Sequence, residues 1–302
     1  MIDEALLATL MQAEATSGDE LALSRLLEDL SLRFAPRART LRAGNTLVVF
    51  KGAPRLAVFA HVDSVGFTLG YDRQLIAVGG PSVEGVVAVR STVGDQVYRG
   101  HAVCEDKEDR LFRLADGEGP PGTRWVYDTP PAFGPAALQG AYLDNRFGVY
   151  TALRLLDMLP DVCVAFTAAE EVSGRGALEA GRILYERSDI RRALVADITW
   201  ATPYVRPGKG PALSLRDAFV PRKAYFDAVR AAAEGSGVPF QIEIESAGSS
   251  DGGMLERSGF GIDWVFVGAP ENGYHTATET LVADDAVNMI RLFAHLVATL
   301  SA

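Results

Sequence analysis

Short apolar runs alternate with amphipathic segments over most of the chain. The runs at 56–60, 162–166, 193–196 and 263–267 contain almost no polar residue, which is typical of strands buried on both faces of a sheet. Helical periodicity marks the segments 2–13, 19–33, 145–158, 175–187, 223–234 and 284–300. This alternation predicts an α/β fold. Ser17 and Glu20 have the spacing of a capping box at the start of the second helix.

The region from 68 to 140 has a different pattern. It is rich in Gly, Pro, Val and charged residues, its apolar runs are short, and it shows no helical periodicity. Turn signals at 79–81 and 117–122 divide it into short strands. We therefore expect a small β-rich domain at 68–140, inserted into a discontinuous α/β domain formed by 1–67 and 141–302.

The composition of the chain limits the kinds of partner that it can bind. The chain has 302 residues and a net charge of -10, which argues against nucleic acid or an anionic membrane as a partner. The two cysteines, Cys104 and Cys163, form neither a disulfide framework nor a cysteine-rich zinc site. No signal peptide and no stretch of transmembrane length is apparent. We expect a cytoplasmic protein.

Side chains that bind metals follow the apolar runs or begin a helix: His61 and Asp63, Asp144, Glu170 and Glu171, Asp197, and His275. In open α/β sheets, functional sites collect beyond the carboxyl ends of the strands. We therefore expect these side chains to lie together. Two imidazoles and several carboxylates suit zinc, cobalt or manganese better than magnesium or calcium.

Five of these residues can supply the ligands of a binuclear site. Asp144 would bridge two ions. His61 and Asp197 would bind one ion, and Glu171 and His275 would bind the other. Such ions polarise a scissile carbonyl and lower the pKa of an attacking water.

The remaining two residues have expected catalytic roles. Glu170 and Glu171 are adjacent, and side chains of adjacent residues in an extended segment point in opposite directions. Glu170 is therefore free to act as the general base that takes a proton from the attacking water. Asp63 lies two residues from His61 and would orient its ring.

Each residue also has a purely structural explanation. Asp144 could cap its helix, Asp197 could hydrogen-bond to a loop, and the glutamate pair could form a solvated turn. The position of all of them at strand ends or helix starts favours a metal site.

A second pattern suggests a rival function. The sequence Gly248-Ser249-Ser250-Asp251-Gly252 matches the nucleophile elbow of serine α/β-hydrolases, with Asp263 and His275 as possible partners of Ser250. However, the preceding strand, 240–245, alternates strictly between polar and apolar residues, which predicts a solvated polar face, and an elbow follows a central buried strand. This alternative also leaves the glutamate pair unexplained. A non-catalytic relative that acts as a binding protein is a third possibility.

Taken in order, the motifs resemble those of the glutamyl aminopeptidase or TET aminopeptidase family of di-metal exopeptidases, some of which are described as endoglucanases. The matching segments are 60–63 with Gly66-Phe67, 143–146, 167–177, 196–199, 208–212, 248–252 and 274–276. They cover the α/β part from end to end. The roles that this family gives to its motif residues agree with those assigned above.

The resemblance implies a three-layer α/β/α zinc-exopeptidase-like catalytic domain with a barrel-like insert. It also implies two divalent ions per subunit, zinc or cobalt, peptide substrates that lose their N-terminal residues, and a homo-oligomer between a dimer and a dodecamer. Two features depart from the family pattern: Ser64 stands where the family has Glu, and the insert is short. The His-x-Asp-Ser sequence also resembles a related aminopeptidase family with co-catalytic zincs.

Overall fold

The computed structural model describes residues 2–301. Its helices are α1 (Glu4–Gln12), α2 (Leu21–Phe34), α3 (Leu143–Met158), α4 (Arg175–Arg187), α5 (Lys223–Glu234), α6 (Asp251–Arg257) and α7 (Ala283–Leu300), with a short 3-10 turn at Tyr71–Arg73. The helical segments predicted from the sequence correspond to α1 to α5 and α7. Within the described residues, no helix combines the length and the apolar character needed to cross a membrane.

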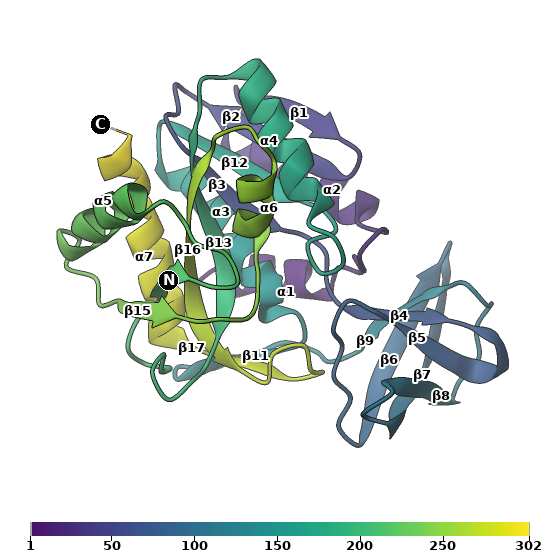
Figure 1. The fold of residues 1–302 in the computed structure, drawn as a ribbon. Coiled ribbons are helices and arrows are strands. Elements are labelled where there is room, and N and C mark those ends of the chain that lie inside the picture. Colours follow the sequence, from purple (N-terminus) through teal and green to yellow (C-terminus); the bar gives the residue numbers. More distant parts are fainter. Residues whose placement is uncertain (1, 302) are drawn as a thin grey trace.

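The larger sheet forms the centre of the α/β part (Figure 1). It contains β1 (Arg39–Ala43), β2 (Thr46–Lys51), β3 (Ala57–His61), β10 (Ala132–Phe133), β11 (Ala137–Gly140), β12 (Val162–Thr167), β13 (Arg192–Trp200), β14 (Ala212–Arg216), β15 (Gln241–Ile244), β16 (Asp263–Asn272) and β17 (Glu279–Val282). The main path is β1-β2-β12-β3-β13-β16-β17-β11-β10, and β14 pairs with both β15 and β16. The central strands β12, β3, β13 and β16 run parallel.

Each central strand contains an apolar run because both of its faces are covered. In β3, Val58 and Ala60 pack into a core shared with α1, α2, α3, α5 and α7. Ala57 and Phe59 point the other way, into a second core shared with α4 and α6. The alternation of side chains along a strand thus divides one apolar run between two cores. The predicted three-layer α/β/α arrangement is confirmed.

The smaller sheet is a closed barrel with the strand order β4-β5-β8-β7-β6-β9. Its strands are β4 (Gly66–Leu69), β5 (Gln74–Val78), β6 (Val86–Val93), β7 (Gln96–Asp106), β8 (Leu111–Asp116) and β9 (Arg124–Tyr127). A separate core surrounds Phe67 and Trp125, and the barrel stands beside the α/β part (Figure 1). Closure leaves no unpaired sheet edge. The predicted β-rich, barrel-like insert is therefore present.

The domain boundaries at 67/68 and 140/141 remain a prediction. Strands β10 and β11 lie inside the predicted insert, yet β11 pairs with β17 and so extends the larger sheet. The barrel strands themselves run from Gly66 to Tyr127.

Strand register aligns the ends of the central strands at one edge. Thr167 at the end of β12 pairs with His61 at the end of β3. In the next pair, Val195 of β13 lies opposite Phe59 of β3, so Asp197 two residues on is level with His61. The loops that follow these strands therefore emerge together, as expected for a parallel sheet.

Candidate metal centre

Five of the predicted site residues form two groups of possible metal ligands, and Asp144 belongs to both. One group contains His61, Asp144 and Asp197, and the other contains Asp144, Glu171 and His275. Within each group the ligand atoms all lie within 4.8 Å of one another. Asp144 Oδ1 is 3.1 Å from His61 Nε2, and Asp144 Oδ2 is 3.6 Å from His275 Nε2. The two oxygens of Asp144 thus face different groups.

The other contacts complete the two groups. His61 Nε2 lies 3.5 Å from Asp197 Oδ1, and His275 Nε2 lies 3.1 Å from Glu171 Oε2. All five side chains line one cleft, together with Glu170, Trp200 and Tyr274 among others. Asp144 does not cap α3, because the N-cap position is Tyr142.

Both histidine rings are held through the nitrogen that faces away from the groups. His61 Nδ1 is 3.2 Å from the backbone oxygen of Asp63, and His275 Nδ1 is 3.1 Å from the backbone oxygen of Gly80. A proton on each Nδ1 would leave Nε2 free to bind a metal. Gly80 comes from the segment between β5 and β6, and a Cβ there would lie 2.9 Å from His275 Nδ1. Only glycine allows this approach.

Asp63 is fully buried and joins two loops of the site. Its Oδ1 accepts a hydrogen bond from the backbone N–H of Glu170 at 2.9 Å, and its Oδ2 accepts one from the N–H of Glu171 at 3.1 Å. Its carboxylate is 3.6 Å from His61 Nδ1, farther than its own backbone oxygen. The role that the contacts give Asp63 is therefore mainly to fix the glutamate turn.

The predicted capping box before α2 is wrong. The N-cap of α2 is Glu20, without a capping side-chain hydrogen bond. Ser17 instead donates its hydroxyl to Asp63 Oδ2 at 2.6 Å. Glu20 accepts from the backbone N–H of Gly18 at 2.7 Å and of Ala169 at 3.1 Å. Both side chains brace the site because the loop packs against the strand ends.

Two further residues support the ligands, and sequence reasoning gave them no role. Glu279 is buried and accepts hydrogen bonds from the backbone N–H groups of Asp144 and His275, each at 3.1 Å. The guanidinium of Arg146 is also fully buried. It donates to the backbone oxygens of Leu10 at 3.0 Å and Val62 at 2.5 Å. Arg146 was visible in the sequence only as part of a motif.

The site holds more buried negative charge than its histidines can balance. Burial is the largest influence on Glu170, Glu171 and Asp197, and it raises the pKa of each carboxyl. Burial disfavours the charged form of His275, but Asp144 and Glu171 outweigh it and raise the pKa of His275 to about 11. Glu171 Oε1 is buried and has no hydrogen-bond partner among the described residues. An orphaned carboxylate oxygen, two imidazoles and converging carboxylates fit divalent cations.

The structure argues against a serine hydrolase that uses Ser250, Asp263 and His275. Ser250 is a buried N-cap of α6, and its Oγ accepts from the N–H of Gly252 at 3.2 Å. Asp263 begins β16, and His275 lies beyond the other end of this 10-residue strand, a separation of about 30 Å along the strand. Asp263 therefore cannot orient the ring of His275.

Comparison with known proteins agrees with this geometry. The family model of M42 glutamyl aminopeptidases matches residues 120–292. The chain belongs to this family. M42 peptidases are metal-dependent aminopeptidases, so membership makes the chain a hydrolase of the peptidase class.

The individual proteins that resemble this M42 chain share less than 30% of its sequence. The "Putative aminopeptidase" of Acetivibrio thermocellus is 27% identical over 285 residues, which cover 84% of this chain and 86% of that protein. The fold is similar to that of a TET aminopeptidase from a marine sediment Thaumarchaeota archaeon, with a TM-score of 0.86, 21% identity, and coverage of 97% and 96%. The Pyrococcus horikoshii TET1 peptidase matches with a TM-score of 0.78, 21% identity, and coverage of 97% and 98%.

Proposed function

We propose that this chain removes N-terminal residues from peptides by hydrolysis at a binuclear metal centre. The observation that carries the proposal is the position of Asp144, which shares one carboxylate between two groups of possible ligands. A carboxylate that faces two such groups is the expected bridge of a two-ion site.

The residues divide naturally between two divalent ions. His61 and Asp197 would hold one ion, Glu171 and His275 the other, with Asp144 between them. Zinc suits this set of nitrogen and oxygen donors, and cobalt or manganese would also fit. When bound, the ions would polarise the scissile carbonyl and lower the pKa of the attacking water.

Glu170 is the proposed general base. It lines the same cleft as the ligands but belongs to neither ligand group. Its backbone N–H is held by Asp63, so its side chain starts from a fixed position. It would take a proton from the attacking water and pass it to the leaving amine. Asp63 would act as a positioning residue for Glu170, Glu171 and His61.

We also propose that the protein forms a homo-oligomer. The Pyrococcus horikoshii TET1 peptidase, which shares the fold over nearly the whole chain, assembles into a tetrahedron or a large octahedral shell. The size of an assembly of this chain, from a dimer to a dodecamer, would be measured by light scattering.

The function is tested with a panel of aminoacyl anilides. The purified protein is assayed before chelation, after chelation, and after zinc, cobalt or manganese is returned. We expect activity that chelation abolishes and metal restores. Activity that survives chelation but is lost to a serine-directed reagent would refute the proposal. Stable metal binding without turnover of any substrate would instead indicate a binding protein.

A further inference from the structure

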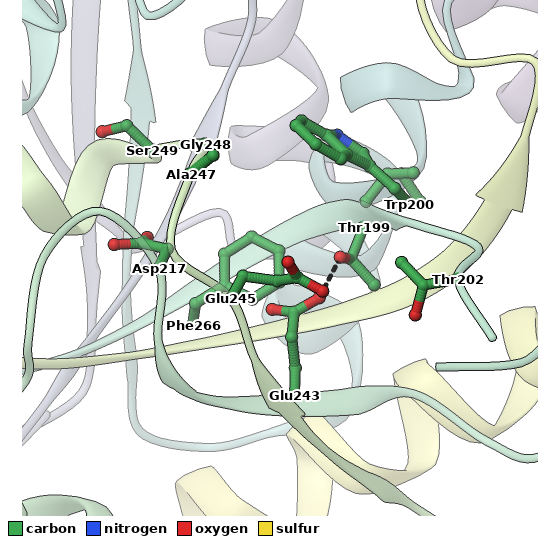
Figure 2. A pocket seen from close by; sticks show the side chains of 11 residues that line it. Thr199, Trp200, Thr202, Asp217, Glu243, Glu245, Ala247, Gly248, Ser249 and Phe266 are labelled. Carbon is green, nitrogen blue, oxygen red and sulfur yellow. Dashed lines mark hydrogen bonds between the residues drawn. The ribbon is translucent and has the colours of Figure 1, made fainter. Parts of the chain in front are cut away.

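A second cavity shares part of its wall with the cleft of the metal centre, and Figure 2 shows the residues that line it. Ile198, Trp200, Gly248, Ser249 and Phe266 line both this cavity and the cleft that holds the ligands. Its empty space, counted together with the solvent at its open mouth, is about 450 Å³. A substrate whose scissile bond lies at the ligands would therefore have this cavity next to its first side chain.

Three carboxylates line the cavity: Asp217, Glu243 and Glu245. Asp217 is 8% exposed and Glu243 is 4% exposed. Asp217 Oδ1 accepts from the backbone N–H of Phe219 at 2.6 Å, and Glu243 accepts from the hydroxyl of Thr199. Figure 2 shows the Glu243 side chain directed to Thr199 on the cavity wall. Within residues 2–301, none of the three carboxylates forms an ion pair with a basic side chain.

At Glu243 and Ile244 the burial is the reverse of what the sequence predicts. Alternation over 240–245 predicted that the glutamates face solvent. Instead Glu243 is 4% exposed, whereas its neighbour Ile244 is 66% exposed. Burying a carboxylate without a cation is costly, and burial raises the pKa of both Asp217 and Glu243. A local violation of this kind is expected at a functional site.

The spacing of the carboxylates favours an organic cation over a metal ion. Only two groups in the described residues bring three possible ligands within 4.8 Å of one another, and both lie in the metal centre. Asp217, Glu243 and Glu245 do not form such a group. A larger cation with several N–H donors can reach separate acceptors, as guanidinium and ammonium groups do.

The aromatic part of the cavity wall suits the aliphatic chain that carries such a cation. Trp200 is 40% exposed, stacks on Tyr274 with ring centroids 5.0 Å apart, and joins Phe266 in lining the cavity. Tyr274 in turn packs against the ring of His275 at 4.2 Å. Lysine and arginine bury their methylene groups against apolar surface while the charged end stays polar. Tryptophan also attracts cations over its face.

We propose that this cavity receives the side chain of the N-terminal residue and selects lysine and arginine. The inference rests on the aminopeptidase function proposed above. The aliphatic stem lies against Trp200 and Phe266, and the charged end lies among Asp217, Glu243 and Glu245. Neutral side chains leave the buried carboxylates unbalanced, and acidic side chains are repelled.

The test compares kcat/KM for lysyl, arginyl, leucyl and glutamyl p-nitroanilides. We expect lysyl and arginyl substrates to exceed the leucyl substrate by about 10- to 100-fold, the range for hydrogen bonds to charged groups, with the glutamyl substrate slowest. Glu245→Gln should lower the lysyl-to-leucyl ratio by about 10-fold or more. Glu245 is only partly buried, so this variant should fold. Asp217→Asn, as a second variant, should lower the same ratio.

The control is Glu234→Gln, which removes an exposed carboxylate at the end of α5 and should leave the ratio unchanged. A wild-type preference for leucyl or glutamyl substrates would overturn the inference while leaving the aminopeptidase function intact. An equal fall for all substrates in Glu245→Gln would also overturn it, because the carboxylate would then serve the α-amino group common to all of them. No turnover of any substrate would refute the underlying function instead.

Discussion

Replacing Asp63 by asparagine tests whether one buried carboxylate holds the site together. Asp63 is 0% exposed and accepts from the backbone N–H of Glu170, the N–H of Glu171 and the hydroxyl of Ser17. Asparagine has the same shape, but it carries an amide NH₂ in place of one acceptor oxygen. Whichever way the amide lies, an N–H or O–H donor of the loop meets another donor.

The expected loss of stability in Asp63→Asn follows from these contacts. A hydrogen bond to a charged group contributes about 1.5–3 kcal/mol, and a buried donor left without a partner costs about 1–3 kcal/mol. Losing one such bond and leaving its donor without a partner should therefore reduce the free energy of unfolding by about 2.5–6 kcal/mol. The loosened glutamate turn would displace Glu170 and Glu171, so kcat should fall together with the affinity for metal.

Urea unfolding, metal content and kcat are measured for the wild type and for Asp63→Asn. Asp19→Asn is the matched control, because Asp19 lies in the loop of Ser17 but is exposed; it should change the free energy of unfolding by no more than about 0.5 kcal/mol. If Asp63→Asn unfolds like the control and keeps normal kcat, the reasoning about this carboxylate is refuted.

Three further predictions concern the surroundings of the site. Arg146→Lys should lower the free energy of unfolding by about 2–4 kcal/mol, since a lysine cannot bond both Leu10 and Val62 as the guanidinium does; unchanged urea unfolding would contradict this. Zinc at 100 times its dissociation constant should stabilise the metal-free protein by about 2.7 kcal/mol for each bound ion, and calorimetry that shows no shift would argue against a site formed in the folded chain. Ser250→Ala should lower the free energy of unfolding by about 0.5–2 kcal/mol, because a helix cap is lost, but it should leave kcat within about twofold. A loss of activity with normal folding would instead favour the serine mechanism.

Much of the fold could be predicted because its signals are local. An apolar run such as 56–60 must be covered on both faces, so the layers follow from the strands and the helices between them. His61 and Asp197 could be placed at one edge of the sheet because parallel strands end together. The cores and contacts of the central strands match those expectations.

The supporting contacts could not be predicted because they join distant segments. Ser17 and Asp63 are 46 positions apart, and nothing near Ser17 in the sequence distinguishes a helix cap from a partner of Asp63. Gly80 reaches His275 across 195 positions. The alternation around Glu243 does not reveal which face of the strand is buried, because the pairing of β14 with β15 decides which face is covered.

In the proposed binuclear site, Glu170 serves proton transfer and not metal binding. Glu170→Gln is loaded with zinc, and ions per chain are measured beside kcat on the best aminoacyl anilide. We predict two ions per chain, as in the wild type, and a kcat lower by about 100- to 10,000-fold. A variant that keeps both ions with near-normal kcat, or one that loses an ion, would contradict this role for Glu170.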